Sequence, residues 1–366
     1  MEGVKRTLDD TLRRLNLEAQ AKHTLEEKLA TIADEVDNQK NHLRDVQAEV
    51  EAKDRELAKA REELAEGKKS LDELLDSGNG LKLERFGRYS FVRPEPQAMW
   101  APRLGADAWN ADGRFVPGQG RAEDDEEGGG WTLSPDLPEA WQVGYDGLRF
   151  LARPTPFRHL GFFPEQAPHW RWCAARIAGF AARHGRRPRV LNLFAYSGIA
   201  SLHAAQAGAE VTHVDASKKA IAQAFENRDT AGMQDAPIRF ITEDATRFVE
   251  REIRRGRSYD GIILDPPKYG RGPKGERWRI ETDLVPLLDG CRQILSDTPR
   301  FLLLTIYAIR ASSQAAHYAL SDVMAGASGT VYSGELVSVE SQPEPRVIAQ
   351  ANYARWAPED QEPANG

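Results

Sequence analysis

Cysteine and long apolar runs are scarce in this 366-residue sequence. The two cysteines, Cys173 and Cys291, both fall in helical patterns, which indicates neither a disulfide framework nor a metal-binding cluster. The longest strongly apolar run, 301–309, is about half of the roughly 20 residues that cross a bilayer. The opening residues, MEGVKRTLDD, mix both signs of charge and lead into no apolar stretch, unlike a secretory signal peptide. We therefore expect a cytoplasmic protein without a membrane segment.

A strong positive charge is also absent. The net charge is −7, and the first 75 residues hold 14 Lys and Arg against 19 Asp and Glu, a net of −5. The remaining chain is close to neutral, which does not favour non-specific binding to nucleic acid. Three local basic clusters are present, however. Those within 183–189 and 251–257 fit solvated helix ends, and the third has the members Lys268, Arg271, Lys274, Arg277 and Arg279.

A heptad repeat fills the N-terminal quarter. Apolar residues recur at every seventh position, with Lys22 as the one exception: Leu8, Leu15, Leu29, Val36, Leu43, Val50, Leu57, Leu64 and Leu71. No proline occurs before Pro94. This pattern predicts a coiled-coil helix over residues 1–75 that joins copies of the chain into a homo-oligomer. Docking to a different coiled-coil protein is the alternative.

Composition divides the rest of the chain into further units. Gly78 and Gly80, around Asn79, are expected to end the helix, and short β-like pieces with Pro and Gly follow. We expect a small β-rich subdomain over residues 76–160, with a hairpin at 141–151 that turns at Tyr145-Asp146-Gly147. An α/β domain should cover residues 161–357, followed by a disordered tail at 358–366.

Apolar runs and helical patterns alternate regularly from Pro188 onward, which predicts a mostly parallel sheet with helices on both faces. The expected strands are 189–194, 210–214, 238–241, 261–264 and 301–306, and a final antiparallel hairpin is formed by 331–340 and 346–356. The expected helices are 199–207, 216–231, 245–255, 284–295 and 313–324.

Polar and small residues follow the first three strands, at the sheet edge where open α/β sheets bind ligands. A turn follows the first strand, with the residues Asn192, Phe194, Ala195, Tyr196, Ser197 and Gly198. A dinucleotide fingerprint, G-x-G-x-x-G, is missing there. Asp215 ends the second strand, where a carboxylate can accept hydrogen bonds from ribose hydroxyls. Asp244 and Ala245 follow the third strand, and Asp244 is either an adenine ligand or only a helix N-cap.

The fourth strand ends in the segment Asp265-Pro266-Pro267-Lys268-Tyr269. Two prolines remove backbone donors and fix φ, so that carbonyls and a carboxylate can face outward together. Such a wall accepts hydrogen bonds from an amino group or from the edge of a planar base. The alternative is a strand that ends in an ordinary proline turn.

The segments VLNLFAYSG, THVDAS, EDA and DPPKY together resemble class I S-adenosylmethionine-dependent methyltransferases, and in particular the 23S ribosomal RNA large-subunit branch that contains the cytosine-C5 enzyme. The segment HLGFFPEQ, 159–166, is similar to the branch as well. The resemblance covers roughly residues 75–357 and implies a Rossmann-like seven-stranded sheet. It implies S-adenosylmethionine as cofactor, with the turn at 192–198 near the methionine portion, Asp215 on the ribose and Asp244 near the adenine. Asp265 would lie beside the sulfonium, and Phe162 and Gln166 would help to close the site.

Two departures from that branch affect the expected reaction. The branch carries a small RNA-binding PUA domain where this chain has the heptad segment. Cytosine-C5 chemistry needs a thiolate nucleophile, which the branch places just after the fifth strand, whereas this chain has Thr305-Ile306-Tyr307-Ala308-Ile309 there. We therefore expect methyl transfer without a cysteine nucleophile.

Ribosomal RNA is the expected acceptor. Asp265 and the Pro266 carbonyl would orient it, Lys268 and Tyr269 would contact it, and the basic run would meet phosphates or be only an exposed loop. A methyltransferase that acts on protein or on a small molecule is the second possibility. A cofactor-binding scaffold assembled through the coil is the third.

Overall fold

A computed structural model describes residues 72–118, 129–307 and 311–358, together with six helical positions further upstream: Glu35, Gln39, Lys40, Arg44, Val46 and Gln47. The chain divides into two units, Met1–Glu66 and Gly67–Gly366. Apart from the six positions, the expected coiled coil of the first unit lies outside the described residues, and so does the expected tail beyond residue 358. The coil and the homo-oligomer stay predictions.

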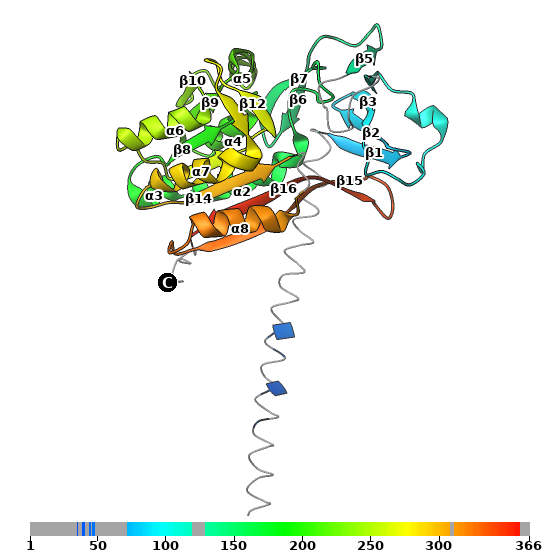
Figure 1. Cartoon of the computed structure of the whole chain (residues 1–366). Helices are drawn as coiled ribbons and strands as arrows, with labels where there is room; N and C mark the ends of the chain where they lie inside the picture. The colour runs from blue at the N-terminus through cyan, green and yellow to red at the C-terminus, as the bar shows by residue number, and fades with distance from the viewer. Residues whose placement is uncertain are drawn as a thin grey trace, which may run out of the picture. The chain divides into compact units, whose positions relative to one another are not determined.

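The second unit is built around a seven-stranded sheet with the order β10-β9-β8-β11-β14-β16-β15 (Figure 1). Its strands are β8 (Arg189–Leu193), β9 (Glu210–Asp215), β10 (Ile238–Thr242), β11 (Gly261–Leu264), β14 (Phe301–Ile306), β15 (Thr330–Val339) and β16 (Val347–Ala357). The first five pair in parallel, and β16 runs antiparallel to both of its neighbours. The predicted parallel sheet with its antiparallel C-terminal hairpin is confirmed.

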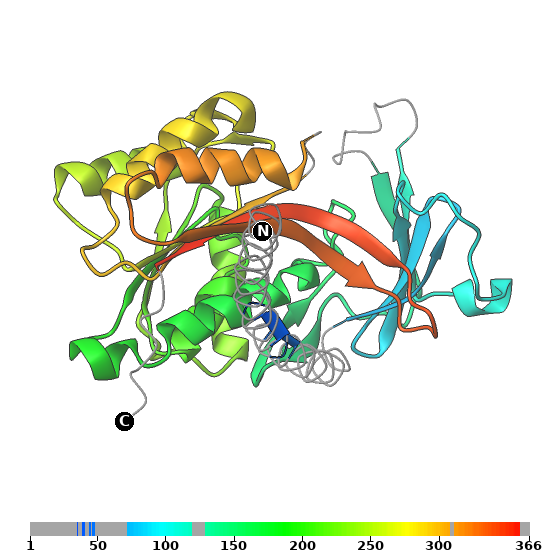
Figure 2. The same ribbon diagram turned by 90° about the horizontal axis from the view of Figure 1, so that it is seen from below.

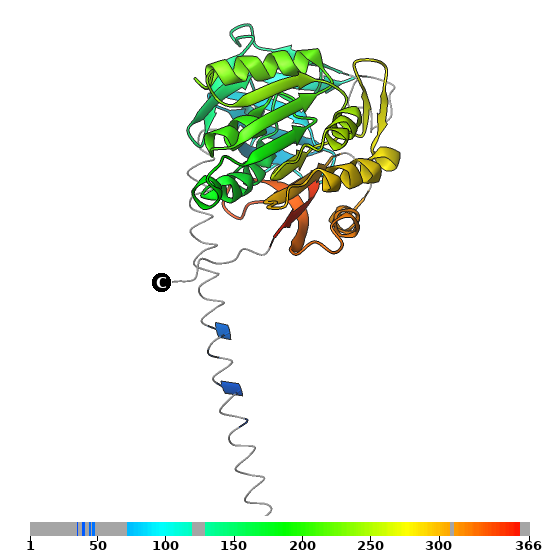
Figure 3. The ribbon, with the colours of Figure 1, turned by 90° about the vertical axis from the view of Figure 1, so that its left-hand side faces the viewer.

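Helices cover both faces of this sheet (Figure 3). One face carries α2 (Ala167–Ile177), α4 (Ile199–Gln206) and α5 (Lys218–Thr230), with the short α3 (Phe180–His184) after α2. The other carries α6 (Ala245–Arg254), α7 (Ile280–Gln293) and α8 (Ser313–Val323).

Strand β14 is buried on both of its faces. Phe301 and Leu303 belong to the core cluster that contains Cys173 of α2, whereas Leu302 and Leu304 belong to the cluster that contains Phe248 of α6. A strand buried on both faces has no polar alternation, and for this reason its bounds could be predicted from an apolar run.

A separate five-stranded sheet precedes this domain, in the order β1-β2-β3-β4-β5. Its strands are β1 (Glu73–Gly78), β2 (Leu81–Phe86), β3 (Tyr89–Pro94), β4 (Gly113–Pro117) and β5 (Gly129–Leu133), with a short helix η1 (Ala106–Trp109) between β3 and β4. The expectation of a helix up to residue 75 is wrong for its last three residues, which lie in β1. Leu74, which lies three residues after Leu71 and so fits the second apolar position of the heptad, is instead buried beside β2.

Asn79 and Gly80 connect β1 to β2 as a two-residue loop, with φ of 53° and 75°. Both values lie in the left-handed region that a type I′ turn requires. These residues form a hairpin turn, where the sequence had suggested only the end of a helix.

A second hairpin, β6 (Trp141–Tyr145) and β7 (Leu148–Ala152), turns at Asp146 and Gly147 as predicted. Its residues share one core cluster with Phe91 of β3 and Trp170 of α2. The β-rich part and the α/β part therefore pack through common apolar contacts.

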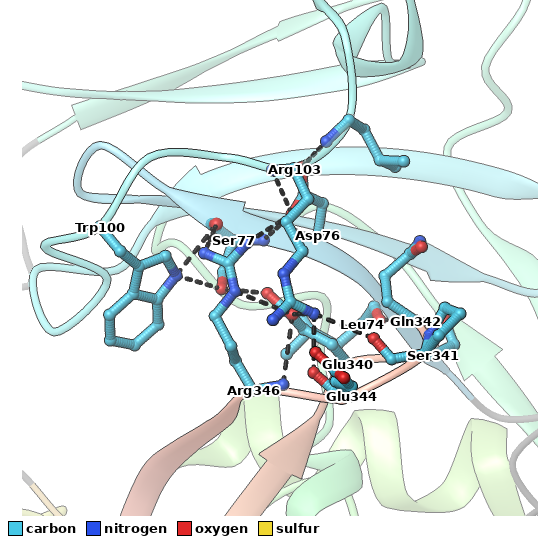
Figure 4. Close-up of polar contacts among 12 residues, drawn as sticks. Leu74, Asp76, Ser77, Trp100, Arg103, Glu340, Ser341, Gln342, Glu344 and Arg346 are labelled. Carbon is cyan, nitrogen blue, oxygen red and sulfur yellow. Dashed lines mark hydrogen bonds and ion pairs between the residues drawn. The ribbon is translucent and has the colours of Figure 1, made fainter.

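The C-terminal hairpin also ties the two sheets together. In Figure 2, β15 and β16 extend from beside α8 to the strands of the five-stranded sheet. The Ser341 amide donates to the Leu74 carbonyl at 2.9 Å. Figure 4 shows Asp76, Ser77, Glu340 and Arg346 pointing toward one another at this junction.

Polar groups at the junction are closely paired although three of them are almost fully buried: Asp76, Ser77 and Glu340. The Ser77 hydroxyl donates to Glu340 at 2.5 Å, and the Arg346 guanidinium lies 3.3 Å from the same carboxylate. Burying charged groups is tolerated where they are paired and hydrogen-bonded, as these are.

Within the described parts of the chain, we find no helix whose length and apolar content would let it span a bilayer.

Candidate active site

The turn between β8 and α4, residues 194–198, has an unusual backbone. Phe194 and Tyr196 have φ of 53° and 45°, and Gly198 has φ of 86°. Positive φ at two bulky residues costs energy and is found where surrounding contacts impose it, often at functional sites. Here the amide of Tyr196 donates to Asp215 Oδ2 at 2.8 Å, and the amide of Ala195 donates to the Val214 carbonyl at 3.1 Å. The end of β9 therefore holds the turn in place.

Two buried side chains support the same turn from behind. Asn192 donates to Ser201 Oγ at 2.9 Å, and Ser201 in turn lies 3.0 Å from His213 Nδ1. Asn227 of α5 donates to the Ser197 carbonyl at 2.8 Å and accepts from the Leu151 amide at 2.9 Å. Asn227 therefore links the β6–β7 hairpin to the turn, a role that the sequence did not indicate.

A cavity opens beside this turn and extends to the ends of β8 and β11. Nine of the twelve residues expected to bind cofactor line it: Phe162, Gln166, Asn192, Phe194, Ala195, Tyr196, Ser197, Gly198 and Asp265. Five further residues line it that the sequence did not single out: Phe163, Trp170, Ile199, Ala200 and Ile263. Residues from distant segments thus meet at the carboxyl edge of the sheet, where ligands of α/β folds bind.

Three expected cofactor ligands are absent from the cavity wall. Asp215 holds the amides of Tyr196 and Ser217, each at 2.8 Å, and burial raises the pKa of its carboxyl. Asp244 caps α6 by accepting from the Arg247 amide at 3.0 Å, so the N-cap alternative is present in the structure. Ala245 is buried in the core.

Asp265 projects into the cavity from the end of β11. Its Oδ2 accepts a hydrogen bond of 2.5 Å from Gln166 Nε2, and its Oδ1 is buried without a hydrogen-bond partner. Burial, together with the nearby charge of Glu165, raises the pKa of this carboxyl to about 8 against the lowering effect of the Gln166 hydrogen bond. A carboxyl in this state can exchange a proton near neutral pH.

Gln166 also contacts Tyr307, which belongs to the segment where a nucleophilic cysteine is missing. Its Nε2 lies 3.1 Å from the hydroxyl of Tyr307, which directly follows β14. The rule that pointed to Asp265, polar residues at the carboxyl ends of parallel strands, would also have found Tyr307. Glu165 likewise lies within the quoted segment 159–166, next to Gln166, and was not singled out.

The two prolines after Asp265 present their carbonyls differently. The Pro267 carbonyl accepts from the indole N–H of Trp278 at 2.7 Å. The Lys268 carbonyl accepts from the Ile280 amide at 3.1 Å. In the described part of the chain no hydrogen bond occupies the Pro266 carbonyl, so that this group stays available beside the carboxylate.

A small hairpin, β12 (Tyr269–Arg271) and β13 (Arg277–Arg279), extends from this motif. Buried Trp278 fixes it, with its ring 4.9 Å from that of Phe194 on the cavity wall. Tyr269 is 62% exposed, and Lys268 Nζ lies 5.4 Å from its ring centroid. Arg271, Lys274, Arg277 and Arg279 are exposed on the same hairpin.

Aromatic rings gather beside Asp265. Phe163 lies 6.0 Å from Tyr196 and 5.5 Å from Tyr307 between ring centroids, and His159 lies 5.1 Å from Phe163. Burial lowers the pKa of His159 to about 3, which keeps its ring neutral. This arrangement offers apolar surface to a flat molecule next to a hydrogen-bonding carboxyl.

Neither cysteine contributes to the cavity. Cys173 in α2 and Cys291 in α7 are buried in the core, at 3% and 0% exposure, and burial raises the pKa of both thiols, that of Cys173 to about 12. Thiols of this kind are not nucleophilic near neutral pH.

Comparison with known proteins identifies the family. Residues 94–289 match the family model of S-adenosylmethionine-dependent methyltransferases. This match covers more than half of the chain. The chain belongs to that family.

A solved structure with close similarity is the SAM-dependent methyltransferase from Agrobacterium tumefaciens. It is 48% identical, the alignment covers 79% of this chain and 90% of that one, and the TM-score is 0.73. A putative methyltransferase from Streptococcus mutans shares the fold at 17% identity, with 82% and 78% coverage and a TM-score of 0.60. These alignments cover about four fifths of the chain, which is more than the α/β domain alone.

Curated relatives match a shorter segment. Ribosomal RNA large subunit methyltransferase K/L of Shewanella baltica is 38% identical over 154 residues, which is 42% of this chain and 20% of that protein. A putative ribosomal RNA large subunit methyltransferase of Methanocaldococcus jannaschii is 41% identical over 93 residues, 25% of this chain and 24% of that protein. This chain therefore spans about a fifth to a quarter of the length of these relatives.

Proposed function

We propose that this enzyme transfers the methyl group of S-adenosylmethionine to a base nitrogen of ribosomal RNA, without a cysteine nucleophile. The observation that carries the proposal is the Asp265 carboxyl, held by Gln166 at 2.5 Å with its second oxygen unpartnered in the cavity. An amino or imino group of a base can donate to that oxygen and to the Pro266 carbonyl together.

The residues present fit the cofactor. The unpartnered Asp265 oxygen can face a cation, and the open turn at 194–198 with Asn192 would hold the methionine portion. Asp215 has lone pairs beyond its two backbone contacts and would accept from the ribose hydroxyls. Asp244 would accept a hydrogen bond from the adenine amino group through the carboxylate lone pairs that its N-cap bond leaves free. Ala245 would lie next to the adenine. Phe162 and Gln166 would close the cavity. Bound there, the cofactor supplies an electrophilic methyl group.

Alignment is then the main task of the protein. Transfer to nitrogen needs a base lone pair held in line with the methyl carbon and shielded from water, which is worth several kcal/mol of barrier without covalent catalysis. Asp265 and the Pro266 carbonyl fix the acceptor edge, and Phe163 and Tyr307 offer ring surface to its face. A base must leave its stack to reach such a cavity.

RNA as the acceptor is supported by two observations. Lys268, Tyr269 and the exposed basic residues of the β12–β13 hairpin provide phosphate contacts and a stacking surface next to the site. The curated relatives are described as ribosomal RNA large subunit methyltransferases.

The proposal is tested with the purified full-length protein, labelled S-adenosylmethionine and unmodified 23S and 16S rRNA transcripts. We expect label in the 23S transcript, and an N-methylated nucleoside after digestion. Asp265→Ala should remove the incorporation. Formation of 5-methylcytidine would contradict a mechanism without a thiol, and label only in added ribosomal protein would contradict RNA as acceptor.

A further inference from the structure

Four polar side chains from three separate segments are grouped around Asp265, which lines the cavity. Glu165 and Gln166 come from η2 (Pro164–Gln166), Asp265 follows β11, and Tyr307 follows β14. Gln166 Nε2 donates to Asp265 at 2.5 Å and lies 3.1 Å from the Tyr307 hydroxyl. Burial and the charge of Glu165, the residue before Gln166, raise the pKa of Asp265.

The donors of this cluster are few. Gln166 has two amide hydrogens, and both are used, one on Asp265 and one on Tyr307. Asp265 is left with a single donor on Oδ2, and its Oδ1 is buried without a partner.

Positive charge acts on Glu165. Burial raises the pKa of Glu165, and Lys82 of β2 and Arg93 of β3 lower it. Both cations also bind the Glu84 carboxylate, Lys82 at 3.5 Å and Arg93 at 2.7 Å. The charge that acts on Asp265 is the like charge of Glu165. Tyr196 and Tyr307, the other titratable groups facing this end of the cavity, have pKa values raised by burial and stay neutral.

We propose that the cluster of Glu165, Gln166, Asp265 and Tyr307 distinguishes the sulfonium cofactor from its neutral thioether product by exchanging one proton for the cofactor's positive charge. Glu165 and Tyr307 are then residues that determine cofactor selectivity. The inference rests on the proposed function, because it uses the placement of Asp265 beside the sulfonium.

The exchange balances in charge. Without ligand, Asp265 keeps its proton, because burial and the neighbouring Glu165 disfavour a second negative charge. When a cation occupies the cavity, the carboxyl releases that proton to solvent, and the total charge of the site is unchanged. The thioether carries no charge, so that nothing compensates the loss of the proton and the carboxyl stays neutral.

The ionised carboxylate has a second use. An acceptor nitrogen that gains a methyl cation must lose one proton to return to its original charge, and Asp265 is placed to take it. The carboxyl is then neutral again when the thioether is the ligand. Proton uptake by Asp265 therefore returns the cavity to the state that holds the product less tightly than the cofactor.

Calorimetry tests this on the full chain without any acceptor. S-adenosylmethionine and S-adenosylhomocysteine are titrated at pH 7 in two buffers of different ionisation enthalpy. We expect close to one proton released per sulfonium cofactor bound, and almost none per thioether. The released proton should disappear when the titration is repeated well above pH 8, since the pKa of Asp265 is about 8.

Two variants locate the effect. Glu165→Gln removes the like charge, so that Asp265 is already partly ionised before the cofactor binds. The variant should release less proton and should lower the Kd of S-adenosylmethionine relative to that of S-adenosylhomocysteine by about 3- to 10-fold. Tyr307→Phe removes the hydroxyl that accepts from Gln166 and should change the same ratio of dissociation constants. Glu335→Gln, at an exposed position of β15, is the matched control and should change neither value.

Equal proton release for both ligands in the wild type, or an unchanged ratio in both variants, overturns the inference and leaves the proposed function standing. Failure of the wild type to bind S-adenosylmethionine would instead remove the proposed cofactor site.

Discussion

The indole N–H of Trp278 donates a hydrogen bond of 2.7 Å to the carbonyl oxygen of Pro267. The two residues are eleven positions apart, and Trp278 belongs to the β12–β13 hairpin that follows Pro267. The bond fixes the second proline of the Asp265 motif from outside the cavity. It also leaves the Pro266 carbonyl as the neighbour of the carboxylate, so the geometry of the acceptor wall depends on a residue that does not touch the acceptor.

Trp278→Phe should therefore raise the KM for the acceptor and lower kcat/KM about tenfold, an effect of roughly 1.4 kcal/mol. The affinity for S-adenosylmethionine should change much less. Trp141→Phe is the control, because its indole N–H also donates to a buried carbonyl, that of Phe86 at 3.0 Å, away from the cavity. Both variants should lose about 1 kcal/mol of stability. Equal kinetic losses in the two would contradict a positioning role for Trp278.

Removal of both thiols should leave the reaction intact. In the double variant Cys173→Ala and Cys291→Ala, we expect at least half of the wild-type kcat, since neither sulfur reaches the cavity. Stability should fall by about 1 kcal/mol per site, because each change leaves a small void in a packed core. A folded double variant with activity reduced by orders of magnitude would show that a thiol takes part.

The raised pKa of Asp265 predicts a pH-dependent cost to folding. The folded state binds this proton more tightly than the unfolded state, whose carboxyl has the ordinary value of 3.8. The wild type should therefore lose stability on this account as pH rises from about 4 to 8, and no further above 8. Asp265→Asn has no ionisable carboxyl at this position and should not lose stability in this way. At pH 8 this difference should favour the variant by about 1–3 kcal/mol in the free energy of unfolding. Thermal unfolding of both proteins between pH 5 and 9 measures it, and an offset that does not vary with pH would refute the assignment.

Glu340→Gln should destabilise the protein by about 3 kcal/mol. The change removes a buried charge that Arg346 and Ser77 both use and leaves the guanidinium with the longer ion pair of 3.8 Å to Asp76. Glu226→Gln breaks the ion pair with Arg153, which is partly exposed, and should cost less than about 1 kcal/mol. Denaturant unfolding of the two variants gives the comparison, and equal losses would mean that the junction in Figure 4 contributes little.

The basic hairpin predicts a salt effect. Replacement of Lys274 and Arg277 by Ser should reduce the slope of log affinity against log salt by about 2 for binding to the 23S transcript, because two phosphate contacts are lost. Replacement of Arg254 and Arg257 by Ser, at exposed positions around the end of α6, is the control and should leave the slope unchanged. A similar slope change in both would indicate only a general charge effect.

Much of the α/β domain could be predicted from the sequence because its strands are buried on both sides. Phe301–Ile306 and Gly261–Leu264 were predicted with the observed bounds, since an apolar run ends where burial ends. Asp265 was found for a related reason, as the first polar residue after such a run. Periodicity gave the wrong prediction at Leu74, because an apolar residue there fits a heptad and a strand equally well. Pairing of β1 with β2 places Leu74 in the sheet.

Contacts between distant positions could not be read from the sequence. Gln166 and Tyr307 are 141 positions apart and meet only because β14 and η2 end at the same cavity. Asn227 supports Ser197 from a helix whose sequence shows only an amphipathic pattern. The residues missed were therefore those whose role comes from a neighbour supplied by another segment.

The pairing of Leu74 with Ser341 and of Ser77 with Glu340 sets an order of events during synthesis. More than 260 residues separate the partners. At a translation rate of about 5–20 residues per second, the first sheet, complete at Leu133, exists for roughly 10–40 s before Glu340 is made. During that interval Asp76 can accept its hydrogen bonds from Leu104 and Trp109 of the β-rich part, whereas Ser77 lacks Glu340. The strands that join the two sheets are therefore made after the other strands of both.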